Sequence, residues 1–154
     1  MTAFVLPLLI GVVTGLRSMT APAAVSWASR TGWLDVGSTP LAFFGFTFTP
    51  WVFTAPGLGE LVIDQLPTTP SRTETMPFGT RIVVGALCGG AIGASGGALV
   101  TGLVAGIAGA TLGTLGGHAL RARLAAAFGR DRPAALIEDA VAIGGALLVM
   151  VALP

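Results

Sequence analysis

The sequence predicts an all-α fold, a polytopic bundle of transmembrane helices that forms a single domain over residues 1–154. Of these residues 53% are hydrophobic and only 10% are charged, and the mean hydropathy is +0.86. Soluble domains carry about 25% charged residues, so eight basic and seven acidic side chains are too few to solvate a surface of this size. Apolar runs of helical length recur along the chain, which indicates several membrane spans.

The first apolar run is ambiguous in length. Residues 3–16 make only about 14 apolar positions, fewer than the ~20 that cross a bilayer. Continued through Arg17 to residue 28, the run reaches about 26 residues, which is enough for a tilted crossing. The segment between Gly15 and Pro22 can instead interrupt this helix. If the chain doubles back there, the number of spans falls by one.

The remaining spans are predicted at residues 41–66, 78–94, 98–120 and 134–153. The segments between them, at 30–40, 67–77, 95–97 and 121–133, are polar or rich in glycine and proline, as connecting loops are. The bundle therefore has four or five spans.

The arginines predict the orientation. With five spans, the N-terminus shares one side of the membrane with the loops at 67–77 and 121–133. These loops hold most of the basic residues: Arg72, Arg121, Arg123, Arg130 and Arg132. Because cytoplasmic loops carry an excess of Lys and Arg, we expect a multi-pass membrane protein with its N-terminus in the cytoplasm and its C-terminus outside.

Glycines recur at helical spacing in the first, third and fourth apolar runs. Small residues four positions apart let membrane helices approach closely. Three alternatives remain open: tight packing within the chain, a face for a homodimer, and a glycine-lined pore. The residues in question are Gly11, Gly15, Gly85, Gly89, Gly93, Gly97, Gly102, Gly106, Gly109 and Gly113.

Arg17 is the one charged side chain in an apolar N-terminal run. An ionisable group inside a membrane segment is costly, so it indicates a functional site whose partner has to be found. Glu60 and Asp64 are four residues apart and share one face of the second span. Glu60 would lie about 9 Å inside the cytoplasmic boundary, and we expect Arg17 to pair with it. That pair is either a static lock between helices or part of a cavity whose carboxylate binds a cation or carries protons.

Two further acids, Glu138 and Asp139, enter the last span soon after its start. The helix dipole favours acids there, but they also lie at a depth like that of Glu60. No metal or cofactor site is expected, because His118 has no histidine or cysteine at zinc-site spacing. No enzyme is expected either, since membrane phosphatases and phosphotransferases need dense clusters of Asp, His, Lys or Arg. The net charge of +1 gives no indication of a nucleic-acid partner.

Several phrases, in order, resemble a family of small bacterial integral membrane proteins catalogued as domain of unknown function 4126. They are Gly-Leu-Arg-Ser-Met-Thr-Ala-Pro-Ala at 15–23, Ser26-Trp27, Gly59-Glu60-Leu61 with Asp64, Leu66-Pro67, Thr69-Pro70-Ser71-Arg72-Thr73 and Glu138-Asp139-Ala140. Gln65 departs from the lysine expected before Leu66, so no role for a cation there is implied. The resemblance implies a membrane location and a single site formed by Arg17, Glu60, Asp64, Arg72, Glu138 and Asp139.

Two classes of function follow. The first is a transporter or channel-like permease for a small polar or amphiphilic solute. Its substrate site would be built from Arg17, Ser18, Glu60, Asp64, Arg72, Glu138 and Asp139. The second is a non-transporting membrane assembly or lipid-interacting protein whose intramembrane charges are structural. The expected partners are the lipid bilayer, a small-molecule or ion ligand, and a second copy bound through the glycine-rich faces.

Overall fold

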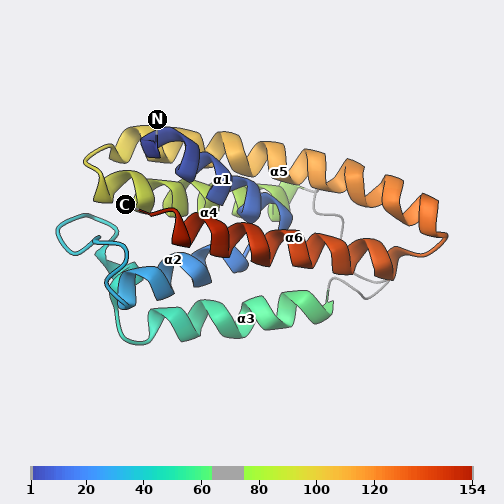
Figure 1. The fold of residues 1–154 in the computed structure, drawn as a ribbon, viewed down its shortest axis with the longest axis horizontal. Helices are drawn as coiled ribbons and strands as arrows, with labels where there is room; N and C mark the ends of the chain where they lie inside the picture. The colour runs from blue at the N-terminus through green and yellow to red at the C-terminus, as the bar shows by residue number, and fades with distance from the viewer. Residues whose placement is uncertain (1, 64–74, 154) are drawn as a thin grey trace.

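The computed structural model describes residues 2–63 and 75–153. Within these ranges the chain is all-helical, as predicted, and the helices lie side by side (Figure 1). The elements are α1 (Thr2–Leu16), α2 (Thr20–Arg30), the 3-10 helix η1 (Ala42–Gly45), α3 (Thr49–Ile63), α4 (Thr75–Ser95), α5 (Leu99–Phe128) and α6 (Asp131–Val151).

Three of the described helices, α4, α5 and α6, are long and apolar enough to cross a membrane, and α1 is a shorter apolar helix. Large apolar side chains such as Leu112, Leu147 and Leu148 are exposed on them, as they are where helices face lipid rather than water. The protein is therefore a helical membrane bundle.

The first apolar run is not a continuous crossing. The helix ends at Leu16, the next begins at Thr20, and α2 runs back toward the end of the molecule from which α1 starts (Figure 1). The sequence left open both an interruption between Gly15 and Pro22 and a return of the chain after it, and the structure shows both. Both chain ends therefore lie at one end of the bundle, opposite the turn between α5 and α6. The expectation that the N-terminus shares a side with the 121–133 loop is wrong for this reason.

Pro22 helps to explain the break. It lies in the first turn of α2, where its missing N–H costs no hydrogen bond. In a helix continuing from α1, the same ring would clash with the carbonyl of Ser18 and remove a bond. The chain thus starts a new helix instead of prolonging the old one.

Glycines bring α1, α4 and α5 into backbone contact. A Cβ placed on Gly89 or Gly106 would lie under 3.0 Å from backbone atoms of the facing helix, and the same holds for Gly11 and Gly109 between α1 and α5. Packing within the chain, one of the three alternatives, is confirmed for these residues. Gly97 differs: it sits in the turn before α5 with a φ of 72°. The packed glycine faces are covered inside the chain, so self-association stays a prediction that requires another surface.

The last two helices are longer than the hydropathy pattern predicted. Helix α5 continues to Phe128 because the segment 121–128 consists mostly of good helix formers, among them Arg121, Arg123 and four alanines. It ends at Gly129, whose φ of 66° suits the left-handed position after a helix. Helix α6 then begins at Asp131, an acid in the first turn.

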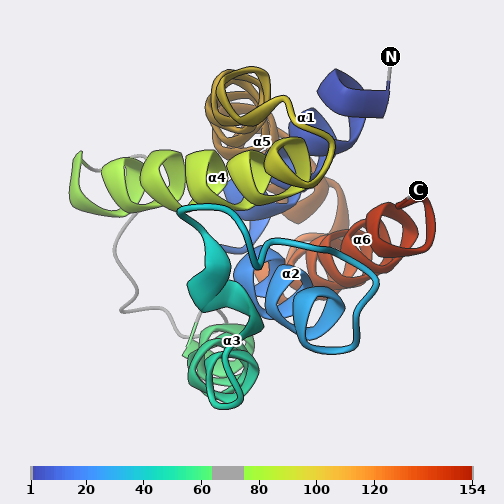
Figure 2. The ribbon, with the colours of Figure 1, turned by 90° about the vertical axis from the view of Figure 1, so that its left-hand side faces the viewer.

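Helix α2 lies among the other helices, between α3 and the group formed by α4 and α6 (Figure 2). Trp27 joins α2 to α3: its indole Nε1 donates to Thr54 Oγ1 at 3.1 Å, and its ring meets that of Trp51 edge-on at 5.1 Å. Because α2 is enclosed on several sides, the break between α1 and α2 lies inside protein.

Candidate functional site

The break between α1 and α2 consists of Arg17, Ser18 and Met19. It lies against Arg81, the seventh residue of α4, so it sits about 9 Å along that membrane helix. Backbone that leaves the helix at this depth has peptide groups that the same helix cannot satisfy, and in membranes such backbone is found only inside protein or along a cavity. Charged side chains of α3 and α4 satisfy these groups here.

Glu60 of α3 binds the start of α2. Its Oε1 accepts from the N–H of Ser18 at 2.9 Å and from Ser18 Oγ at 2.6 Å, and its Oε2 accepts from the N–H of Met19 at 2.9 Å. A helix N-terminus carries partial positive charge and unpaired N–H groups. The carboxylate therefore caps α2 with charge of the favourable sign.

Arg81 of α4 binds the end of α1 in the complementary way. Its Nη1 donates to the carbonyl oxygens of Gly15 at 2.6 Å and Leu16 at 3.0 Å, where the helix end carries partial negative charge. Its Nη2 lies 3.6 Å from Glu60 Oε1. The two caps are thus linked as an ion pair, and both side chains are nearly buried.

Arg17 forms an ion pair with Asp139 of α6, through Nη2 and Oδ1. Its side chain is fully buried. The sequence-based pairing of Arg17 with Glu60 is therefore wrong: the peptide groups of the break and Arg81 occupy Glu60, and α6 brings Asp139 to Arg17. Hydropathy gives the depth of a charge along a helix, but it does not give the direction in which the side chain points.

Glu138 belongs to a neighbouring cluster. It precedes Asp139 on α6 but faces α5, where Arg121 Nη1 donates to its Oε2 at 3.3 Å. Arg121 Nε also donates to Asp131 Oδ1 at 2.9 Å. The two consecutive acids on α6 therefore pair with different arginines: Asp139 with Arg17 at the break, and Glu138 with Arg121 of α5.

Of the predicted site residues, the structure brings Arg17, Ser18, Glu60 and Asp139 to the break and places Glu138 beside them. Asp64 and Arg72 lie outside the described residues.

The sequence analysis did not include Arg81 and Arg121 in the site. Arg81 has the same feature as Arg17, a charge within an apolar run, but no role was assigned to it from the sequence. The role of the Ser18 and Met19 amides could not be predicted from the residue types, because every residue except proline has a backbone N–H.

The cluster offers hydrogen-bond donors, acceptors and exchangeable protons. Among residues 2–63 and 75–153, no three His, Cys, Asp or Glu side chains are grouped so that they could hold a metal ion. Such a cluster can bind a charged or polar group when that group replaces one of the side chains that now contact each other.

Fold and site together define an integral membrane protein of the helical-bundle class, with a broken helix whose two ends are capped by opposite charges. Comparison of the chain with models of protein families, with characterised proteins and with solved structures gives no match. The resemblance to domain of unknown function 4126 stays a prediction.

Proposed function

We propose that this protein is a small permease of the bacterial inner membrane, which passes a small polar or amphiphilic solute across the bilayer at the break between α1 and α2. The observation that carries this proposal is the set of contacts that Glu60 and Arg81 make with the ends of α2 and α1. Broken helices near the middle of a membrane bundle form the solute sites of many transporters.

The capping contacts also suggest how a solute binds. The N-terminus of α2 holds a carboxylate, that of Glu60, and the C-terminus of α1 holds a cation, that of Arg81. A solute with an anionic or cationic group can replace the matching side chain without leaving a helix end uncapped. Such an exchange gives the break two states of similar energy, as a transport cycle requires.

The orientation follows from the arginines at the turn between α5 and α6, which are Arg121, Arg123, Arg130 and Arg132. The positive-inside bias assigns this end to the cytoplasm. Because the chain doubles back after Leu16, both chain ends then face the outside. The break lies in the cytoplasmic half of the bundle.

A second function, a non-transporting assembly or lipid-interacting protein, is favoured by one observation. Every charged side chain at the break has a partner within the chain, and Arg17 has no exposed surface. In that case the cluster is a static lock that holds α1, α2, α3, α4 and α6 together.

Access to Ser18 distinguishes the two functions. Ser18 is half-buried at the break, and cysteine replaces it with little change in size. In a Cys88→Ala background, the only thiol is then the introduced one. For a permease, Ser18→Cys reacts with a small membrane-impermeant thiol reagent in sealed vesicles of either orientation, because the site opens in turn to each side.

Two further variants serve as controls. Thr14→Cys lies one turn earlier in α1, is fully buried and should be protected in both vesicle orientations. Trp33→Cys lies in the exposed loop after α2 and should react from one side alone. Reaction of Ser18→Cys from a single side, or from neither, contradicts the permease; complete protection supports the static lock.

A further inference from the structure

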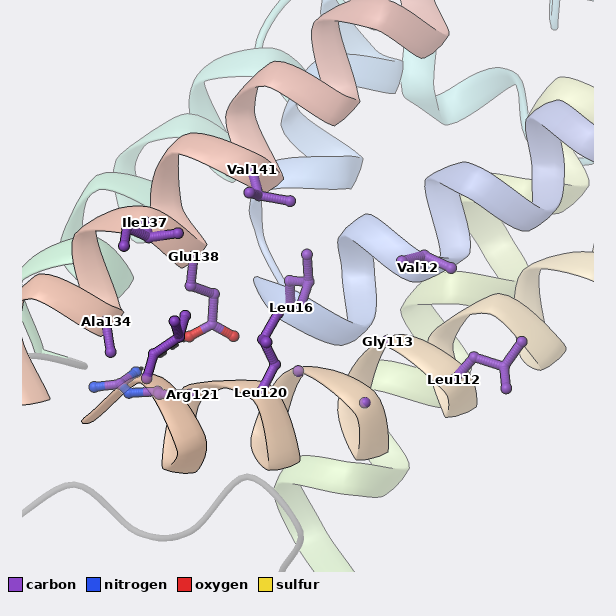
Figure 3. Close-up of a pocket in the computed structure, with 13 residues that line it drawn as sticks. Val12, Leu16, Leu112, Gly113, Leu120, Arg121, Ala134, Ile137, Glu138 and Val141 are labelled. Carbon is purple, nitrogen blue, oxygen red and sulfur yellow. Dashed lines mark hydrogen bonds and ion pairs between the residues drawn. The ribbon is translucent and has the colours of Figure 1, made fainter. Parts of the chain in front are cut away.

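A groove of about 400 Å³ lies between α1, α5 and α6, next to the break (Figure 3). Its walls are almost entirely apolar, with Leu16, Leu112, Leu120 and Val141 among the lining residues. Glycines of α5 form part of its surface, and a Cβ on Gly116 would have no atom within 4 Å. The volume is within the range of ~300–1,000 Å³ found for sites that bind small molecules.

The groove has one polar end. Arg121 and Glu138 line it there and contact each other across α5 and α6, and Figure 3 shows both side chains beside Leu120 and Ala134. Arg121 also pairs with Asp131, whose side chain is 55% exposed. Arg121 holds this carboxylate by two contacts, Nε to Oδ1 at 2.9 Å and Nη2 to Oδ2 at 2.5 Å. Because the Asp131 side chain is open to water, it can turn toward solvent when another anion binds Arg121.

The segment that carries this end is positively charged. Residues 121–138 contain four arginines, at 121, 123, 130 and 132, and two carboxylates, Asp131 and Glu138, so their net charge is +2. Asp139, the next acid, is paired with Arg17. The walls that lead away from Arg121 include the exposed side chains of Leu112, Leu120 and Val141, so the groove is open to the acyl region of the bilayer.

We propose that this groove binds one anionic glycerophospholipid, with an acyl chain along the apolar walls and its phosphate at Arg121. Basic pockets between membrane helices on the cytoplasmic side bind anionic head groups in this way. The site goes beyond the proposed permease activity and does not depend on it, because it uses neither Ser18 nor Glu60. The two proposals therefore fail independently: a permease need not bind this lipid, and a protein that transports nothing can still bind it.

Native mass spectrometry of the detergent-solubilised protein tests the site. The protein is titrated with phosphatidylglycerol and, separately, with phosphatidylcholine and phosphatidylethanolamine of the same acyl chains. We expect one phosphatidylglycerol to bind several-fold more tightly than either zwitterionic lipid. Arg121→Gln should weaken its binding about fivefold, which is the attraction of one basic residue near the surface. Arg123→Gln removes the same charge from the same helix outside the groove, and its effect should be smaller.

A second variant tests the same lipid site by filling space rather than by removing charge. Gly116→Leu places a side chain in the groove at a position where its Cβ meets nothing within 4 Å, and it should abolish binding of the single phosphatidylglycerol. Gly144→Leu is the matched control, since a Cβ on Gly144 of α6 also meets nothing within 4 Å and this residue does not line the groove. Equal binding of the three lipids, equal effects of Arg121→Gln and Arg123→Gln, or unchanged binding in Gly116→Leu would each overturn the proposal.

Discussion

Arg17 is fully buried, and Asp139 forms an ion pair with it there. Transferring two charges from water into a protein interior is costly, and their attraction repays this cost only in part. A pair of apolar side chains would hold α1 and α6 together at least as well. The ion pair is thus better explained by specificity or by function than by stability.

The pair predicts an asymmetry between single and double substitutions. Asp139→Ala removes the carboxylate from a buried guanidinium and should lower the free energy of unfolding by about 3–5 kcal/mol. The double variant Arg17→Met with Asp139→Leu removes both charges and should lie within about 1–2 kcal/mol of the parent protein, or above it. Reversible unfolding in mixed detergent micelles gives both values.

A double variant that is as unstable as Asp139→Ala would mean that Arg17 is held chiefly by groups other than Asp139. The sequence alone predicted that Arg17 was important, because a charge in an apolar run is recognisable by position. It did not predict the partner correctly, because Glu60 and Asp139 lie at similar depths and only the packing of α6 decides between them.

At the level of the helices, α5 makes the closest contacts, with α1 and α4. Gly102 and Gly106 meet the backbone of α4, and Gly109 and Gly113 meet that of α1. Membrane helices gain nothing from excluding water, so this close approach is the main attraction between them. The positions tolerate no side chain, whereas glycines elsewhere on the same helix do.

Gly106→Ala and Gly116→Ala add the same methyl group to α5, but the atoms around that methyl group differ between the two positions. At Gly106 it falls on the backbone of Gly85, and the repulsion should lower the free energy of unfolding by about 1–3 kcal/mol or more. At Gly116 it meets nothing within 4 Å, and the better helix former should raise the stability by up to about 1 kcal/mol. Thermal unfolding in detergent compares the two, and equal Tm values would contradict the packing described.

Hydropathy predicted the helices α4, α5 and α6 to within a few residues at most ends, since long apolar segments have little choice of structure in a membrane. It placed the end of α5 eight residues early, at residue 120, because it treated charged residues as a loop although Arg and Ala prolong a helix. The loop before α3 was also misjudged: residues 41–48 contain η1 and turns rather than the start of a span.

For the whole molecule, the doubled-back start determines the side on which the N-terminus lies, and the arginine-rich turn between α5 and α6 determines the orientation of the bundle. With the arginine-rich turn in the cytoplasm, alkaline phosphatase fused after residue 154 should be active, since the C-terminus lies outside. The same enzyme inserted after Gly129, in the turn between α5 and α6, should be inactive. The reverse pattern would contradict the orientation, and equal activity at both sites would contradict the antiparallel arrangement of α6 itself.

The sequence could not settle this topology, although it contained the break. Gly15 and Pro22 show that a helix can stop there, but the path after the stop depends on contacts with distant segments. Arg81 and Glu60 hold the two helix ends side by side, and they lie 64 and 42 residues after Arg17 and Ser18 in the chain. Local propensity contains no information about contacts of that range.

The pairing of the first and last helices also has a consequence for biosynthesis. Arg17 enters the membrane early, but Asp139 leaves the ribosome about 120 residues later, which at ~5–20 residues per second is on the order of ten seconds. During that interval Arg17 and Asp139 cannot yet form their ion pair. The contact between the start of the chain and α6 therefore forms only after the last helix has been synthesised.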